Sequence, residues 1–387
     1  TIGEGEHLKN PSMVNIHDYF NTYYRPNNVA IILVGDLDPD ATVRSIDKYF
    51  GNWQSKPIPQ FTKRDEPVVT APIIREIKGP QPEHVYMGFL FDGANSHDAM
   101  MAKLVDMVLA NGQAGLIDLD LVQQQKVLNA YSFIDENTDY CFHKFYGEPK
   151  QGQSLEDVQK LMLGEIEKVK KGEFGDWVLP AVIRNLRLQR MKQAESNDGR
   201  AGNMMGCFVH DIPWDKWVHE LDEMEKVTKA QVVQFAKEHY GNNYAVCYKR
   251  LGEANVHKVE KPQITPVVMN KDDVSAFKAS WDQMPQPSIT PRFLDFNKDI
   301  VHLKMDKGGI PVDYIYNDVN QTFSLSYIFD MGTDNIRELG LAINYLEYLG
   351  TDKYTAEQLK MEFYKLGLSF EVNSGRDRVY VTLSGLE

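Results

Sequence analysis

The chain has 387 residues, of which 42% are hydrophobic, and its formal net charge at pH 7 is −13. That size and apolar content are enough for two or three domains, each with a core of its own. The acidic balance argues against nucleic acid and against an anionic membrane surface as partners. No apolar stretch approaches the roughly 20 residues that cross a bilayer, so we expect a soluble chain without a membrane span.

Cysteine usage and the N-terminus add little about location. The three cysteines are far apart and form no Cys-x-x-Cys pair, which indicates neither a disulfide framework nor a thiolate zinc site. The sequence has no initiating Met and no signal peptide at Thr1. We therefore expect a trimmed chain in which the N-terminal targeting region is not present, and the sequence predicts no compartment.

The first stretch, residues 12–50, has the pattern of a helix, a buried strand and a second helix. Asn10 is a good cap for the first helix, whose apolar side chains recur every three or four residues. Residues 29–34 (Val-Ala-Ile-Ile-Leu-Val) are a continuous apolar run, which predicts a strand buried on both faces. Asp38 begins the second helix and Gly51 ends it.

Residues 63–254 have the pattern of a complete domain. Two alternating strands precede a helix that Ser96 caps, and a hairpin over residues 131–146 leads into long helices. The unit closes with a helix that begins at Thr228 and a strand at 244–248. Strands first, with helices packed on one face, predict an α+β fold with a mixed, mainly antiparallel sheet.

The rest of the chain is a linker followed by a third unit. Residues 255–291 contain five prolines around one short helix, predicted to begin at Asn270. Residues 292–387 begin with two strands that turn at 307–309, and a further strand follows at 325–329. The remaining predicted elements are helices at 335–349 and 355–366 and a hairpin at 369–383.

Long-period repetition relates these units. The helix and strand at 228–252 repeat those at 12–35, with an offset of 215 between Asn28 and Asn243. A second offset, 238, relates Phe91 to Phe329, Asp139 to Asp377 and Gly147 to Gly385, and an offset of 237 relates Ser132-Phe133 to Ser369-Phe370. Repetition of this kind indicates duplicated domains. The alternative is unrelated α/β segments that share common turn chemistry.

Several short motifs carry a resemblance to a known family. They are Leu-Lys-Asn-Pro at 8–11, Asp-Tyr-Phe at 18–20, Tyr-Tyr-Arg-Pro-Asn-Asn at 23–28, Val-Gly-Asp at 34–36, and Gly332 through Gly350-Thr351. Together they resemble the pitrilysin/insulinase family of inverted-zincin zinc metallopeptidases, over nearly the whole chain. The resemblance implies homologous two-layer α/β domains, paired into halves that enclose a chamber in which peptides are cut.

The same resemblance assigns the units. It makes residues 1–62 the C-terminal part of a first peptidase-like domain and residues 63–254 a complete second domain. Residues 255–291 become a linker, and residues 292–387 become the N-terminal part of a third domain of inactive type. The sequence is thus interpreted as an internal fragment.

The family's zinc site is His-x-x-Glu-His, in which two histidines bind Zn²⁺ and the glutamate activates a water. This sequence has no such motif, and the resemblance implies that the motif would precede Thr1. The corresponding position in the third unit has Asn344, Glu347 and Tyr348. Because asparagine and tyrosine are poor zinc ligands, we expect zinc as a cofactor of the full-length parent and none in this fragment.

Isolated candidates do not replace that motif. A lone histidine, such as His143 or His210, is far more often a structural residue than a ligand. Glu4 and Glu6 lie in a Gly-rich opening for which we predict no helix, so neither is expected to complete a zinc site.

One loop is a candidate for binding a peptide substrate. The segment Asn-Gly-Gln-Ala-Gly at 111–115 looks like the Gly-rich loop that in some family members holds the amino end of a peptide beside a sheet edge. Gly112 and Gly115 would leave backbone donors and acceptors open to an extended chain. The alternative is an ordinary helix end and turn.

The predicted function is that of a fragment of a zinc-dependent metalloendopeptidase whose parent hydrolyses peptides; the alternative is a non-catalytic scaffold or subunit that only binds proteins. The two incomplete end units lack complementary halves. We therefore expect the strand 29–34, or the face of Phe20 and Tyr24, to contact residues 325–383 within one chain or between two chains.

Overall fold

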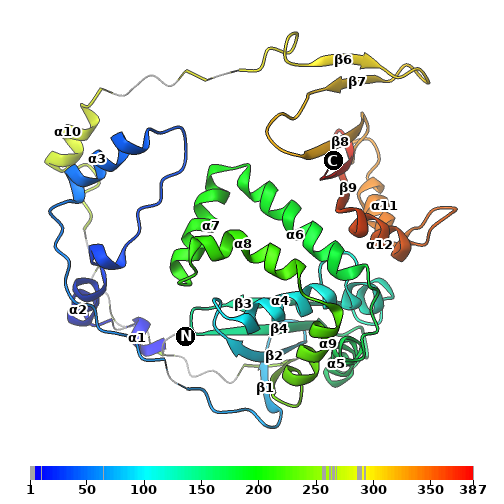
Figure 1. The fold of residues 1–387 in the computed structure, drawn as a ribbon, viewed down its shortest axis with the longest axis horizontal. Helices are drawn as coiled ribbons and strands as arrows, with labels where there is room; N and C mark the ends of the chain where they lie inside the picture. The colour runs from blue at the N-terminus through cyan, green and yellow to red at the C-terminus, as the bar shows by residue number, and fades with distance from the viewer. Residues whose placement is uncertain are drawn as a thin grey trace. The chain divides into compact units, whose positions relative to one another are not determined.

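The structure is a computed structural model, and it describes residues 5–9, 11–63, 65–254, 259–260, 263, 266, 268–285, 290–291 and 293–386. Figure 1 traces the chain. The described residues cluster into two compact units, a smaller one within residues 1–18 and 257–320 and a larger one within residues 19–256 and 321–387.

The larger unit is built around a five-stranded sheet with the strand order β1-β5-β2-β4-β3. The strands are β1 (Ile73–Gly79), β2 (His84–Asp92), β3 (Asn129–Glu136), β4 (Tyr140–Glu148) and β5 (Tyr244–Leu251). Strands β1 and β5 are parallel, and the other neighbours are antiparallel. The predicted α+β class with mixed, mainly antiparallel sheets is confirmed.

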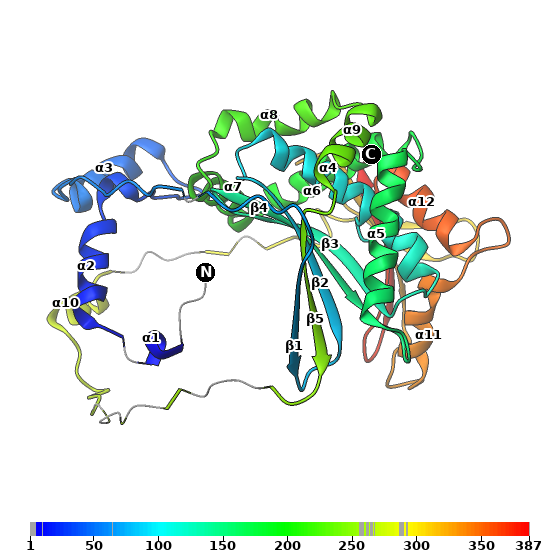
Figure 2. The same cartoon turned by 90° about the horizontal axis from the view of Figure 1, so that it is seen from below.

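Helices pack on one face of this sheet (Figure 2). They are α4 (His97–Leu109), the π-helix η2 (Asp118–Gln123), α5 (Leu155–Lys171), α6 (Val178–Ala194), α7 (Asn197–Val209), α8 (Trp214–Glu225) and α9 (Lys229–His239). Ser96 and Thr228 cap α4 and α9 as the sequence predicts, because each side chain accepts a backbone N–H in the first turn. Ser154 caps α5 in the same way.

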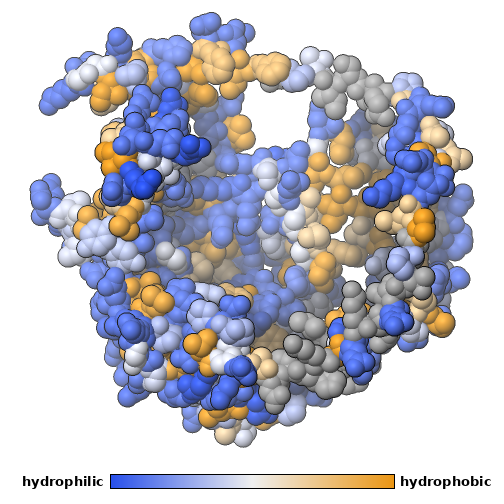
Figure 3. Space-filling model, turned by 180° about the vertical axis from the view of Figure 1, so that it is seen from behind, coloured by the Kyte–Doolittle hydropathy of each residue, from blue (hydrophilic) through white to orange (hydrophobic). Residues whose placement is uncertain are grey.

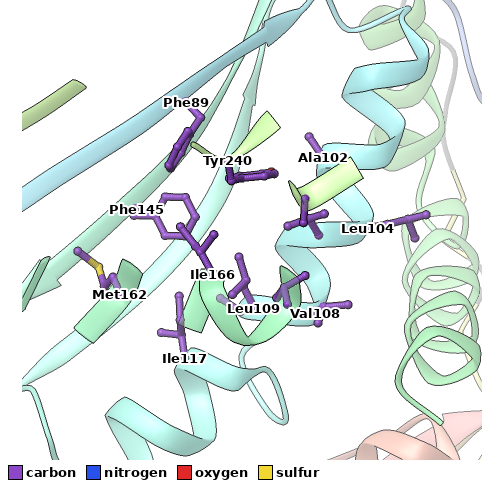
Figure 4. Packing of buried hydrophobic residues seen from close by; sticks show 14 of the residues in the cluster. Phe89, Ala102, Leu104, Val108, Leu109, Ile117, Phe145, Met162, Ile166 and Tyr240 are labelled. Atoms are coloured by element: carbon purple, nitrogen blue, oxygen red, sulfur yellow. The ribbon is translucent and has the colours of Figure 1, made fainter. Parts of the chain in front are cut away.

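The core lies between the sheet and these helices (Figure 4). Alternate residues of β2 point into it, with Val85, Met87, Phe89 and Phe91 all buried, because side chains of a strand alternate between its two faces. Tyr240, which follows α9, is almost completely buried, and its ring centroid lies 4.8 Å from that of Phe89. Burying a side chain of this kind contributes about 1.5–3 kcal/mol to folding.

A second sheet in the larger unit has the order β8-β10-β9 and is antiparallel throughout. Its strands are β8 (Thr322–Phe329), β9 (Leu368–Ser374) and β10 (Val379–Leu386), accompanied by α11 (Leu339–Tyr345), the 3₁₀ helix η3 (Leu346–Tyr348) and α12 (Ala356–Leu366). The sequence predicts one helix over residues 335–349. The structure instead has the shorter helix α11 followed directly by η3.

The pairing registers reproduce the repeat. Val85 lies opposite Gly147 in the first sheet, and Phe323 lies opposite Gly385 in the second, which is an offset of 238 on both strands. The other pair of strands agrees, because Tyr131 opposite Tyr146 corresponds to Ser369 opposite Ser384. The predicted offset of 237 at Ser132 is thus wrong. Matching Ser132 to Ser369 by residue type shifted the alignment by one position.

Residues 29–34 correct the prediction of a buried strand. They follow α2 (Met13–Tyr23) and the 3₁₀ helix η1 (Pro26–Asn28) and precede α3 (Pro39–Phe50), but they pair with no strand in the part of the chain that the structure describes. The backbone is extended where the segment begins, with φ −129° and ψ 135° at Val29. The apolar run specifies an extended segment, whereas a strand also needs a hydrogen-bonding neighbour.

The expected contact between the two ends is not found within one chain. Strand β8 pairs with β10 alone among the described strands. Phe20, Tyr24 and Leu33 are exposed, and so are Leu325 and Tyr327. Figure 3 shows apolar side chains at the molecular surface in several patches.

The smaller unit holds α1 (Gly5–Lys9), α10 (Ala276–Asp282) and the antiparallel pair β6 (Val301–Lys304) and β7 (Pro311–Tyr314). Two predictions are corrected here. Glu6 lies in α1 rather than outside a helix, and α10 begins after Ser275 rather than at Asn270. The Asn270 side chain instead accepts the N–H of Asp272 in a turn, a common alternative to a helix cap. Asn10 and Glu4 lie outside the described residues.

Candidate functional site

The face of the five-stranded sheet opposite the helices carries a group of tyrosines, Tyr86, Tyr131 and Tyr146, which we call the tyrosine patch. The ring centroid of Tyr146 lies 5.0 Å from that of Tyr86 and 4.9 Å from that of Tyr131. The three strands β2, β4 and β3 are adjacent, and their alternation places these rings on one face. Tyr86 and Tyr131 are exposed, so the patch offers flat apolar surface with hydroxyl groups.

The hydroxyl groups of Tyr131 and Tyr146 stay protonated well above neutral pH. Burial, and the hydrogen bond that its hydroxyl donates to Glu148, raise the pKa of Tyr146. Burial, and then the neighbouring Tyr86, also raise the pKa of Tyr131. A neutral phenol can donate to a carbonyl and accept from an N–H, which suits the polar groups of a peptide.

Strand β3 is an edge strand of the sheet, because among the described strands it pairs with β4 alone. A cavity of about 800 Å³ adjoins β3 at Tyr131 and Ser132. The end of α4 and the following loop form one wall, α6 forms another, and Tyr364 of α12 and Ser369 of β9 complete the lining. An open strand edge beside a cavity of this size can receive an extended chain.

The loop with the two candidate glycines borders this cavity. The carboxylate of Asp118 accepts the backbone N–H groups of Asn111 (2.8 Å) and Gly115 (3.0 Å). The side-chain oxygen of Asn111 accepts those of Gln113 (3.1 Å) and Ala114 (2.8 Å). The donors of the loop are therefore used inside it, and Gly115 does not leave its N–H open as expected.

Glycine is required at positions 112 and 115 for two different structural reasons. A Cβ at Gly115 would lie 2.5 Å from the carbonyl oxygen of Leu109, so only glycine fits at that close approach. Gly112 has φ +80° and open space around the position of a Cβ. Gly112 thus lets the loop turn and leaves its surface free beside the cavity.

Two polar atoms in the cavity wall have no hydrogen-bond partner among the described residues. They are the hydroxyl of Tyr364, a residue that is only 2% exposed, and Oε1 of Gln113. Burial and the nearby Asp118 raise the pKa of Tyr364, so its hydroxyl remains a donor. A buried polar atom without a partner is costly, and a ligand that bonds to it would remove that cost.

His143 is a satisfied core residue. Its Nε2 lies 3.0 Å from the Asp106 carboxylate, and its Nδ1 lies 2.7 Å from the Tyr240 hydroxyl. The Ser132 hydroxyl donates to the same Asp106 oxygen at 2.6 Å, and both imidazole nitrogens are used by Asp106 and Tyr240. All four residues are buried, so the group is not arranged as a Ser-His-Asp nucleophile but as a structural network. His210 lies at the end of α7.

The position that corresponds to a zinc motif does not suit a metal ion. Asn344 lies in α11, and Glu347 and Tyr348 lie in η3. The Lys360 ammonium lies 3.8 Å from the Glu347 carboxylate, where it competes with any cation. In the described residues no group of three His, Cys, Asp or Glu side chains could hold a metal ion.

None of the described helices is long and apolar enough to cross a membrane.

The fold and the site define a class: repeated two-layer α+β units, one of which presents an open sheet face beside a cavity. Comparison with known families agrees with that class. The family described as "Peptidase M16 inactive domain" matches residues 14–186. That match covers 173 of the 387 residues, and it agrees with the resemblance to a family of zinc peptidases that the sequence shows.

Individual relatives are distant. The chain is 22% identical over 223 residues to "Zinc protease PqqE" of Helicobacter pylori, which covers 54% of this chain and 48% of that protein. A crystal structure of a protease from Helicobacter pylori matches with a TM-score of 0.60 at 19% identity, covering 64% of this chain and 61% of the other. An M16 inactive domain from Pseudomonas fluorescens matches with a TM-score of 0.54 at 16% identity, covering 65% and 60%. The matched regions span about half to three fifths of these relatives.

Proposed function

We propose that this chain is the non-catalytic, peptide-binding part of a zinc-dependent metalloendopeptidase that hydrolyses peptides or small proteins in an enclosed chamber. The observation that carries the proposal is the tyrosine patch on an open sheet face, next to the free edge of β3 and a cavity. The match of residues 14–186 to an M16 peptidase domain supplies the peptidase context.

The binding mode follows from the strand edge. An extended peptide adds to β3 as a further strand, with its backbone groups bonded to the free groups of that edge. Side chains on one face of the peptide then lie along the tyrosine patch, because a strand alternates its side chains between two faces. The peptide end enters the cavity, where the Tyr364 hydroxyl and the Gln113 amide oxygen find partners.

The glycine loop positions this cavity. Gly115 holds the loop against the end of α4, and Gly112 keeps its surface open for the peptide. Zinc, when bound in such a peptidase, activates the water that attacks the scissile carbonyl. The residues at Asn344, Glu347 and Tyr348 do not fit the ion, so we assign no catalytic step to this chain.

Fluorescence anisotropy with a labelled, unstructured peptide of net positive charge tests the binding site, since the acidic chain attracts such a probe. We expect Tyr131→Ala to weaken binding about tenfold, because truncating an aromatic anchor typically costs more than about 1 kcal/mol. Tyr364→Phe should weaken it less, by loss of one hydrogen bond. Tyr49→Ala, at an exposed tyrosine of α3, is the matched control. Equal affinities for all variants would contradict the assignment of the site.

A non-catalytic scaffold that only binds proteins is the second candidate, favoured by the unsuitable residues at Asn344, Glu347 and Tyr348. Zinc analysis and a cleavage assay on the polypeptide that contains this chain separate the two. The peptidase requires stoichiometric zinc and cleavage that a chelator stops. Binding of the same peptides without zinc or cleavage would establish the scaffold.

A further inference from the structure

On the open face of the five-stranded sheet, a lysine of the chain itself joins a carboxylate to an aromatic ring. Where β2 ends and β4 begins, the Lys63 ammonium lies 3.5 Å from the Asp92 carboxylate and 4.1 Å from the ring centroid of Tyr140. The negative face of an aromatic ring attracts a cation, and the carboxylate adds a second attraction. These three groups form a cation site that the chain fills with its own lysine.

A second site of the same kind lies further along the two strands β3 and β4. Lys144 forms an ion pair with Asp135, and its ammonium lies 5.9 Å from the ring centroid of Phe133 and 5.7 Å from that of Phe142. The register brings these residues together on the open face, because Lys144 lies opposite Phe133 and Phe142 lies opposite Asp135. The chain fills this cation site as well.

The tyrosine patch is a third combination of rings and a carboxylate on this face, and it lacks the cation. Its rings form one row across the sheet, because Tyr146 lies opposite both Tyr86 and Tyr131. Glu148 is two residues further along β4, and its Oε1 accepts the Tyr146 hydroxyl. In the part of the chain that the structure describes, no lysine or arginine lies over these rings or forms an ion pair with Glu148.

The cations nearest to the patch in the sheet have other partners. Lys144 lies two residues before Tyr146 but pairs with Asp135. Arg75 of β1 lies in the same row with β5 in between, and its guanidinium donates to the carbonyl of the preceding residue. The buried Lys249 donates to two backbone carbonyls. The exposed rings are therefore open to a cation from another molecule, whose approach the net charge of −13 favours.

We propose that the tyrosine patch and Glu148 form a subsite for the guanidinium of an arginine in an extended peptide, an inference that rests on the proposed function of this face. A guanidinium is planar, stacks on aromatic rings and donates to a carboxylate in a fixed fork, which suits flat rings beside Glu148. A peptide strand added to β3 places a side chain next to Tyr131. Because neighbouring strands lie about 4.8 Å apart, an arginine there reaches across Tyr131 to Tyr146 and the Glu148 carboxylate.

Fluorescence anisotropy with the full chain and two labelled, unstructured peptides tests the subsite. The peptides differ at one central position, which is arginine in the first and its neutral isostere citrulline in the second, and both carry terminal lysines. At about pH 8 histidine side chains are neutral, so His84 beside the patch adds no charge. We expect the wild type to bind the arginine peptide about five- to tenfold more tightly, through a cation–π contact and an exposed ion pair.

Variants separate the ring contact from the charge contact. Glu148→Gln should reduce the preference for arginine to about threefold, because only the cation–π contact remains. Tyr131→Leu should reduce the preference as well, whereas Tyr131→Phe keeps a ring and should retain it. Glu173→Gln is the matched control, since it removes the same charge at an exposed position beyond the end of α5, and it should leave the preference unchanged.

Two different results would overturn the subsite. If both peptides bind the wild type with equal affinity, or if Glu148→Gln changes the preference no more than Glu173→Gln does, the arginine subsite is wrong and the peptide-binding face stands. If neither peptide binds, the subsite and the proposed function are both wrong.

Discussion

Strands β2 and β8 have the same apolar alternation and differ in what covers them. Met87 and Phe89 of β2 are 2% and 1% exposed, whereas their counterparts Leu325 and Tyr327 of β8 are 44% and 49% exposed. Each strand pairs with the corresponding neighbour, β2 with β4 and β8 with β10, in the same register. The repeated pattern therefore gives β2 and β8 the same register against the next strand, but burial requires the helices and the further strand that pack on β2.

The helices α5 and α9 and the strand β5 supply that cover in the middle unit. Strand β5 lies against β2, α5 packs on β2 and β4, and α9 packs on α4 and α5. A large apolar side chain left half exposed forfeits on the order of 1 kcal/mol of burial. Several such positions together approach the 5–15 kcal/mol by which a whole domain is stable. The two sheets should consequently differ in stability.

The largest expected effect is on independent folding, for which we take residues 66–253 as the middle unit. Expressed alone, this segment should unfold cooperatively, because its sheet and the helices that cover it are contained within it. Residues 293–387 expressed alone should show no cooperative transition. Circular dichroism during urea titration measures both. A gradual transition of residues 66–253 would contradict these boundaries.

Truncating equivalent tyrosines compares the two repeats directly. Tyr240→Ala should lower the free energy of unfolding by about 3–5 kcal/mol, as for other large core side chains. Tyr24→Ala, at the exposed counterpart, should change the free energy of unfolding by less than about 0.5 kcal/mol. Chemical denaturation of both variants measures these losses. Similar losses for both variants would show that Tyr24 is as buried as Tyr240.

We expect an effect of intermediate size on stability from the buried polar network around Asp106 and His143. Asp106→Ala would leave the Ser132 hydroxyl and one ring nitrogen of His143 without a partner. Each buried unpaired group costs about 1–3 kcal/mol, so we expect a loss of several kcal/mol at most. Asn344→Ala, at the exposed counterpart in α11, should be nearly neutral. Thermal melts of both variants measure the difference, and a neutral Asp106→Ala would contradict the role of the network.

Much of the fold could be predicted from local sequence. The caps at Ser96, Ser154 and Thr228 and the hairpin of β3 and β4 depend on a few adjacent residues, so the sequence specifies them. The strand predicted at 29–34 failed because pairing is set by a distant partner. Asn270 failed as a cap because an asparagine that can begin a helix can also close a turn.

The candidate site was only partly accessible to sequence reasoning. The glycines at 112 and 115 indicated the loop, but not that Asp118 would use the N–H of Gly115. The tyrosine patch was missed, since its members come from three strands and meet only once the register is known. Alternation of tyrosines with buried residues along β2 and β4 was the available signal. The free hydroxyl of Tyr364 depends on packing between α12 and the rest of the unit and has no local signal.

The smallest expected effect concerns the carboxyl group of Asp118. Its counterpart in the third unit is Ala356, which has no carboxyl group. Burial raises the pKa of the Asp118 carboxyl above its usual value, and the N–H groups bonded to it offset this only in part. The folded state then holds this proton more tightly than the unfolded state, so ionisation costs stability as pH rises through the unfolded and then the folded pKa. Asp118→Asn removes that titration and keeps one acceptor oxygen. We therefore compare the free energy of unfolding of the wild type with that of Asp118→Asn. The difference, wild type minus variant, should decrease from pH 4 to pH 7. The decrease should be much smaller than the loss of stability expected for Tyr240→Ala. Urea titrations at both pH values measure it, with Asp352→Asn as a control at an exposed carboxyl. A difference that rises with pH would mean that the backbone donors outweigh burial at Asp118.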